Sequence, residues 1–104
     1  MKIDLTNAAL DPNALADSVP YCAHLGVKLS VKDGRLVLEM PFSDHLIGNP
    51  MVPAIHGGVI GSFLETAAIS QVIWETRAKA TPKPVDITID YFRTGRPVTS
   101  YAAA

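Results

Sequence analysis

The chain has 104 residues, of which 48% are hydrophobic and 18% are charged, and its formal net charge is −1. This length predicts one small domain, and this composition excludes a disordered chain. The near-neutral charge, with no run of Lys and Arg, argues against a nucleic-acid-binding protein. The single Cys22 excludes a disulfide framework and fits a reducing compartment, so we expect a cytoplasmic protein.

Neither a signal peptide nor a membrane span is expected. The first twelve residues contain no apolar run of signal-peptide length. The most apolar stretch, residues 54–74, approaches the length of a membrane span, but it contains His56, Glu65 and Gln71. It therefore predicts a buried helix of a soluble protein with no membrane partner.

The first part of the chain predicts a short helix and a β-hairpin. Asp11 is a good N-cap and Pro12 suits the first helical position, and this helix should end before Pro20. Asp33-Gly34 is a strong signal for a two-residue hairpin turn. Apolar residues alternate with polar ones on both sides of it: Val27, Leu29, Val31, Leu36, Leu38 and Met40.

The second part predicts a loop, a long helix and two strands. Residues 42–55 show no period and are expected to form a loop. A helix should run over about 57–78, with Arg77 and Lys79 at its end, and its apolar residues surround most of its circumference. Residues 85–92 alternate as a strand, and another strand should begin at Val98.

The order of these elements predicts the fold class. A helix, a hairpin, a long helix, a strand and a partial strand indicate a single α+β domain over residues 1–104. In such a domain one central helix packs against an antiparallel sheet.

The candidate functional residues lie mainly on the predicted long helix. Gly57 and Gly58 lie at its start, where unpaired backbone N–H groups and the positive end of the helix dipole favour an anion. On their own, these glycines fit a tight turn and close helix packing equally well.

Glu65 strengthens the functional interpretation. It is flanked by apolar residues, and a buried carboxylate is costly to ionise unless it is paired, which makes it a candidate general base or nucleophile. Alternatively it points to water along a polar seam with Ser62 and Thr66. His56 is a base, a substrate hydrogen-bond donor or a loop-fixing residue, and we favour the last.

The remaining reactive residues carry weaker signals. His24 and His45 are expected at the surface or in loops, and no two histidines have metal-ligand spacing, so no metal site is expected. Cys22 has no neighbour in sequence that would activate it. Arg93 and Arg96 are expected to be exposed cations that suit a phosphorylated ligand.

Several stretches resemble a known family. The sequence HGGVIGSFLETAA, preceded by NPMVPAI and followed by VDITIDYFRTGRPVTSYAAA, resembles the hotdog-fold thioesterases of the PaaI / 4-hydroxybenzoyl-CoA thioesterase superfamily. The stretch PYCAHLGVKLSVKDGRLVLEMP is similar to that family's entry loop and first hairpin, so the resemblance covers the chain from Pro20 onward. It implies a hotdog fold, in which an antiparallel sheet wraps around a long central helix, and hydrolysis of acyl-CoA thioesters to CoA and a carboxylic acid.

The resemblance also implies roles for particular residues. The backbone N–H of Gly57 would polarise the thioester carbonyl, Glu65 would attack it or activate water, and His56 would help to shape the site. Further substrate-binding positions are Asn49, Gly58, Ser70 and Arg93, of which Arg93 would lie near the CoA phosphates. No cofactor is implied, because CoA belongs to the substrate, and the family's habit predicts a homodimer or a dimer of dimers with shared active sites.

This chain departs from the family pattern at three places. Asn49 lies one residue upstream of the usual polar position, and Ile69 replaces a usual hydroxyl residue, with Ser70 beside it. Family members also continue with further strands, in a sheet ordered 1-2-4-5-6-3. We therefore expect strands 5 and 6 to be missing here and a lone chain to be poorly stable as a monomer.

Two alternatives to a thioesterase stay open. Hotdog-fold hydratases and dehydratases also place a histidine and an acidic residue around the start of the central helix, although the double glycine after His56 favours the thioesterase. A non-catalytic acyl-CoA-binding module is the second alternative.

Overall fold

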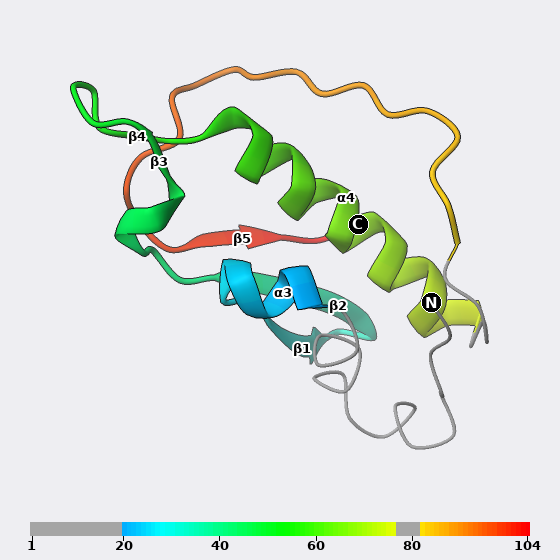
Figure 1. Cartoon of the computed structure of the whole chain (residues 1–104). Helices are drawn as coiled ribbons and strands as arrows, with labels where there is room; N and C mark the ends of the chain where they lie inside the picture. The colour runs from blue at the N-terminus through cyan, green and yellow to red at the C-terminus, as the bar shows by residue number, and fades with distance from the viewer. Residues whose placement is uncertain (1–19, 77–81) are drawn as a thin grey trace.

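A computed structural model of the chain describes residues 20–76 and 82–104 (Figure 1). The helix predicted to open at Asp11 lies outside these residues, as do Arg77 and Lys79. The elements in chain order are α3 (Pro20–Leu25), β1 (Lys28–Lys32), β2 (Arg35–Met40), the 3-10 helix η1 (Asp44–Leu46), β3 (Ile47–Asn49), β4 (Ala54–Ile55), α4 (Gly57–Thr76) and β5 (Ser100–Ala102).

The predicted hairpin is confirmed. β1 and β2 pair antiparallel, with Leu29 opposite Leu38, and the two-residue turn joins Lys32 to Arg35. Asp33 and Gly34 both have positive φ, 53° and 79°, as a tight hairpin turn with the twist of the flanking strands requires. β5 pairs antiparallel with the other edge of β2, which gives the sheet order β1-β2-β5 and confirms the strand expected after Val98.

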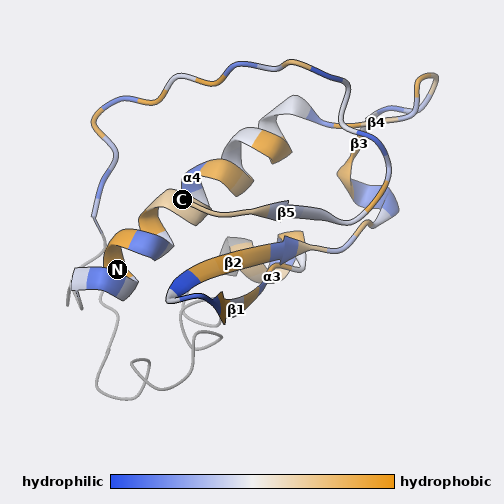
Figure 2. Cartoon of the chain, turned by 180° about the vertical axis from the view of Figure 1, so that it is seen from behind, coloured by the Kyte–Doolittle hydropathy of each residue, from blue (hydrophilic) through white to orange (hydrophobic). Residues whose placement is uncertain are grey.

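α4 covers one face of this sheet and contributes to the core. It packs against β2 and β5, and the face that it turns to them buries Phe63, Ala67 and Ile73. The largest fully buried side chains come from α3, β2 and η1: Leu25, Leu36, Leu38, Met40 and Leu46. Figure 2 shows how strongly apolar residues are concentrated in β2 and in the turns of α4.

One buried polar side chain connects α4 to the sheet. Gln71 is 6% exposed, and its Oε1 accepts a hydrogen bond from the backbone N–H of Leu36 at 2.9 Å. Its Nε2 donates to Glu75 Oε1 at 2.8 Å. Both ends of the buried amide are therefore satisfied, and the helix is held at one position along β2.

Two segments predicted to be irregular are ordered. Residues 42–55 contain η1 and the small antiparallel pair β3–β4, in which Ile47 pairs with Ile55. A helix also begins at Pro20, where we expected only a preceding helix to end. α3 is too short to show a helical period in sequence, and it is stabilised by burial of Cys22 and Leu25 in the core.

The strand predicted over 85–92 is not present. This segment forms no strand and runs back along α4 on the side opposite the sheet (Figure 1). A strand requires the N–H and C=O groups of a neighbouring strand, and no strand of the described residues lies beside it. Val85 and Phe92 are almost fully exposed as a result.

α4 is likewise less enclosed than its composition predicts. Leu64 is 42% exposed and Val72 is 45% exposed. Only the sheet side of the helix is fully covered in the described part of the chain. The apolar residues of the other side face solvent and the segment 82–92.

The Gln71 anchor generates a stability prediction. Gln71→Met keeps the volume but leaves the buried Leu36 N–H without an acceptor, so we expect a loss of about 1–3 kcal/mol of unfolding free energy. Val72→Met introduces the same side chain at a half-exposed neighbouring position and should change stability by less than about 0.5 kcal/mol. Urea unfolding followed by circular dichroism measures both. Equal effects of the two substitutions would contradict the anchoring role of Gln71.

Candidate active site

The start of α4 is capped by a histidine side chain. His56 Nδ1 accepts the backbone N–H of Gly58 at 2.9 Å, and the His56 carbonyl accepts the N–H groups of Val59 and Ile60. The bond from Gly58 requires a lone pair on Nδ1, which assigns the proton of the neutral ring to Nε2. The N–H of Gly57 has no partner in the described part of the chain, so it is free to bind an anionic oxygen.

Glu65 lies two turns further along α4, in a groove of about 250 Å³. The groove is formed by α4 and by the segment that follows it, and it is lined by Glu65, Ala68, Ile69, Val72, Pro82, Lys83, Pro84, Asp86 and Ile87. The Glu65 side chain is half-buried. Its exposure is therefore intermediate between the buried carboxylate and the water-facing carboxylate that the sequence left open. It has no hydrogen-bond or ion-pair partner among the described residues.

The segment 85–92 crosses the side of α4 that carries these groups. Tyr91 Oη donates a hydrogen bond to the Gly57 carbonyl at 2.9 Å. A Cβ atom at position 61 would lie 3.1 Å from Ile89 Cδ1, so Gly61 allows this close approach. Ile87 reaches the groove beside Glu65. The face that carries Gly57, Gly61 and Glu65 is therefore contacted by the same chain.

The structure brings some of the predicted residues together and separates others. His56, Gly57 and Gly58 form one cluster at the helix start. None of Asn49, Ser70 and Arg93 lines the groove that contains Glu65. Asn49 Oδ1 accepts the Met51 N–H within its own turn, Ser70 is buried on the sheet side of α4, and Arg93 is exposed.

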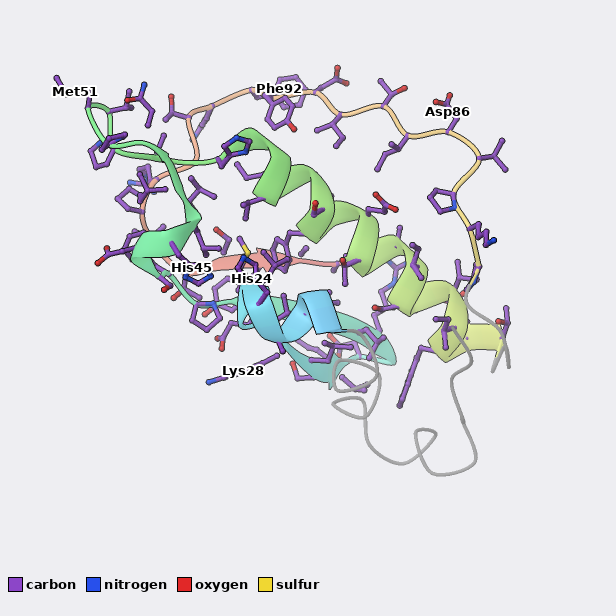
Figure 3. All side chains as sticks on the ribbon, viewed as in Figure 1. His24, Lys28, His45, Met51, Asp86 and Phe92 are labelled. Carbon is purple, nitrogen blue, oxygen red and sulfur yellow. The ribbon has the colours of Figure 1, made fainter. Side chains whose placement is uncertain are left out.

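Two features were not expected from the sequence. One is the Tyr91 bond to Gly57, which spans 34 positions and leaves no local signal. The other is a surface pair, since His45 and His24 have ring centroids 4.9 Å apart (Figure 3). His45 Nε2 donates to the His24 carbonyl at 2.8 Å, and its Nδ1 lies 2.8 Å from Ser43 Oγ. This pair ties α3 to η1.

The described part of the chain offers no support for a reactive cysteine, a metal site or a membrane-spanning helix. Burial raises the pKa of the Cys22 thiol, which disfavours the reactive thiolate. The described residues contain no group of three or more His, Cys, Asp or Glu able to hold a metal ion. Within the same residues, no helix combines the length and apolar character needed to cross a membrane.

Comparison with known proteins supports the fold. A crystal structure of a protein from the thioesterase superfamily matches with a TM-score of 0.79 and 24% sequence identity, over 92% of this chain and 73% of that one. No protein-family sequence profile matches the chain. No curated protein matches it either. The predicted α+β hotdog fold is thereby confirmed.

The histidine cap generates a second prediction. His56→Ala removes the acceptor for the Gly58 N–H and should lower stability by about 0.5–2 kcal/mol. His56→Asn supplies a new N-cap acceptor and should retain most of the stability. Thermal or urea unfolding distinguishes the two variants. A His56→Ala protein as stable as the parent would show that the cap contributes nothing.

Proposed function

We propose that the chain hydrolyses acyl-CoA thioesters to CoA and a carboxylic acid. The observation that carries this proposal is Glu65, an unpaired, half-buried carboxylate at the edge of an apolar groove. The unpartnered N–H of Gly57 at the start of the same helix supports it. The fold shared with a thioesterase-superfamily protein makes this chemistry the natural one to test.

Two routes use the same groups. As a general base, Glu65 takes a proton from water while the water oxygen attacks the thioester carbonyl carbon. The tetrahedral intermediate then collapses, the C–S bond breaks, and the CoA thiolate leaves and is protonated. As a nucleophile, the Glu65 carboxylate adds to the carbonyl carbon, the C–S bond breaks and expels the CoA thiolate, which is protonated, and water then hydrolyses the resulting mixed anhydride. In both routes the Gly57 N–H and the helix dipole stabilise the developing oxyanion.

The groove suggests how the substrate is oriented. Apart from Glu65, its walls on α4 are apolar, and the facing segment contributes Pro82, Pro84 and Ile87 together with the charged Lys83 and Asp86. Such a surface suits the acyl part of the substrate rather than the charged CoA part. We place the CoA phosphates outside the groove, towards the exposed cation Arg93.

The distance between the two catalytic groups favours a site shared by two chains. Gly57 and Glu65 are eight residues apart on one continuous helix, which separates them by roughly 12 Å along the axis. A carbonyl oxygen bound to the Gly57 N–H lies within about 3 Å of that nitrogen. We therefore propose that Glu65 of a second copy completes each site in a homodimer or a dimer of dimers.

The first functional prediction concerns Glu65. Glu65→Gln keeps the shape but removes the base or nucleophile, so turnover of acyl-CoA thioesters should fall by at least about 10²–10⁴-fold. Glu75→Gln, an equivalent change near the end of α4, is the matched control. A thiol-trapping assay of CoA release measures both variants.

The same assay separates the alternatives. Near-normal hydrolysis by Glu65→Gln would refute the role of Glu65. A change in enoyl absorbance without thiol release would identify a hydratase or dehydratase. Binding of CoA esters without any turnover by the parent chain would identify a binding module.

The second functional prediction tests the shared site. Gly57→Pro removes the Gly57 N–H, and proline is tolerated at the first helical position because its missing N–H has no intrahelical partner. Gly57→Pro and Glu65→Gln should each be inactive alone. Refolded together they should regain partial activity, because one heterodimer site combines an intact Gly57 with an intact Glu65. Mixed dimers that form but stay inactive would place the whole site in one chain.

A further inference from the structure

We infer that Tyr91 is a positioning residue for His56, acting through the Gly57–Gly58 peptide group so that the imidazole is held as a neutral Nε2–H hydrogen-bond donor at the start of α4. This inference rests on the proposed thioesterase function for its catalytic consequence.

Two hydrogen bonds meet on one peptide group. Tyr91 Oη donates to the Gly57 carbonyl at 2.9 Å. The N–H of the same peptide group belongs to Gly58 and donates to His56 Nδ1 at 2.9 Å. A donor on the carbonyl oxygen of a peptide makes its N–H a stronger donor, so the two bonds strengthen each other. Tyr91 therefore reinforces the bond that fixes His56.

The imidazole ring belongs to an exposed residue, and two glycines lie close to it. A Cβ atom at position 58 would lie 3.0 Å from His56 Nδ1 and 3.1 Å from Cε1. A Cβ atom at position 48 would lie 3.0 Å from His56 Cδ2. The ring is therefore closely flanked on both edges by glycine backbone. Of the two ring nitrogens, Nδ1 is the one that lies against a glycine in these close approaches.

This arrangement selects one of the roles that the sequence left open for His56. Nδ1 accepts the Gly58 N–H and is not available to take a proton from substrate or water. Nε2 carries the proton of the neutral ring and can only donate. A neutral donor at the helix start that also carries the unpartnered Gly57 N–H suits stabilisation of a developing oxyanion, since a positioned donor costs little reorganisation when the charge appears.

The test compares Tyr91→Phe with Tyr101→Phe. Phe at position 91 keeps the ring but loses the O–H, whereas Tyr101 is an exposed tyrosine on β5 and serves as the matched control. ¹⁵N NMR of the histidine ring nitrogens reports the tautomer. We expect Tyr91→Phe to shift the His56 signals away from a pure Nε2–H tautomer, and Tyr101→Phe to leave them unchanged. Unchanged His56 signals in Tyr91→Phe would overturn the inference.

Kinetics test the catalytic consequence. Tyr91→Phe should lower kcat about two- to tenfold, the range that one neutral hydrogen bond supports, with KM nearly unchanged. In a His56→Asn background the same substitution should cost nothing further, because Tyr91 acts through His56. A full additional loss in that background would overturn the inference. Absence of thioesterase activity in the parent chain would refute the proposed function, while the NMR comparison would still decide the positioning role.

Discussion

The packing of residues 82–92 against α4 determines the shape of the candidate site. Alternate residues of an extended chain are about 6.6 Å apart, and residues four apart on a helix are about 6 Å apart along its axis. Ile87, Ile89 and Tyr91 therefore run beside Glu65, Gly61 and Gly57 in antiparallel order. The two glycines permit contact at the helix start, and further along α4 the groove that contains Glu65 lies between the helix and this segment.

This packing also explains which secondary-structure elements could be predicted from the sequence and which could not. The hairpin, the start of α4 and β5 depend on local signals: a turn with positive φ at Asp33 and Gly34, a capped helix start at His56, and alternation near β5. The strand expected over 85–92 has the right alternation, but strand formation depends on a neighbour that alternation does not encode. Instead of pairing with a strand, Ile89 and Tyr91 of this segment contact α4 at Gly61 and Gly57.

The same distinction between local signals and distant contacts applies to the candidate site. The sequence singled out His56, Gly57 and Glu65 as candidates, because a histidine and two glycines before a helix and a carboxylate within its apolar run are local features. It gave no sign of the Tyr91 hydrogen bond, which joins this side chain to the distant Gly57 carbonyl. It also assigned Ser70 to the substrate by its proximity to Ile69 in sequence. On the helix Ile69 lines the groove, whereas Ser70 lies on the buried face towards the sheet.

These positions limit how a substrate carbonyl can reach the Gly57 N–H. Tyr91 and Ile89 occupy the side of the first two turns of α4, so an approach across that side is blocked by the chain itself. The free N–H of a first helical turn points along the axis, away from the helix body. A carbonyl bound there therefore lies beyond the start of α4, and the same chain's Glu65 is roughly 12 Å further along the helix axis. This geometry supports the proposal that Glu65 of a second copy completes the site.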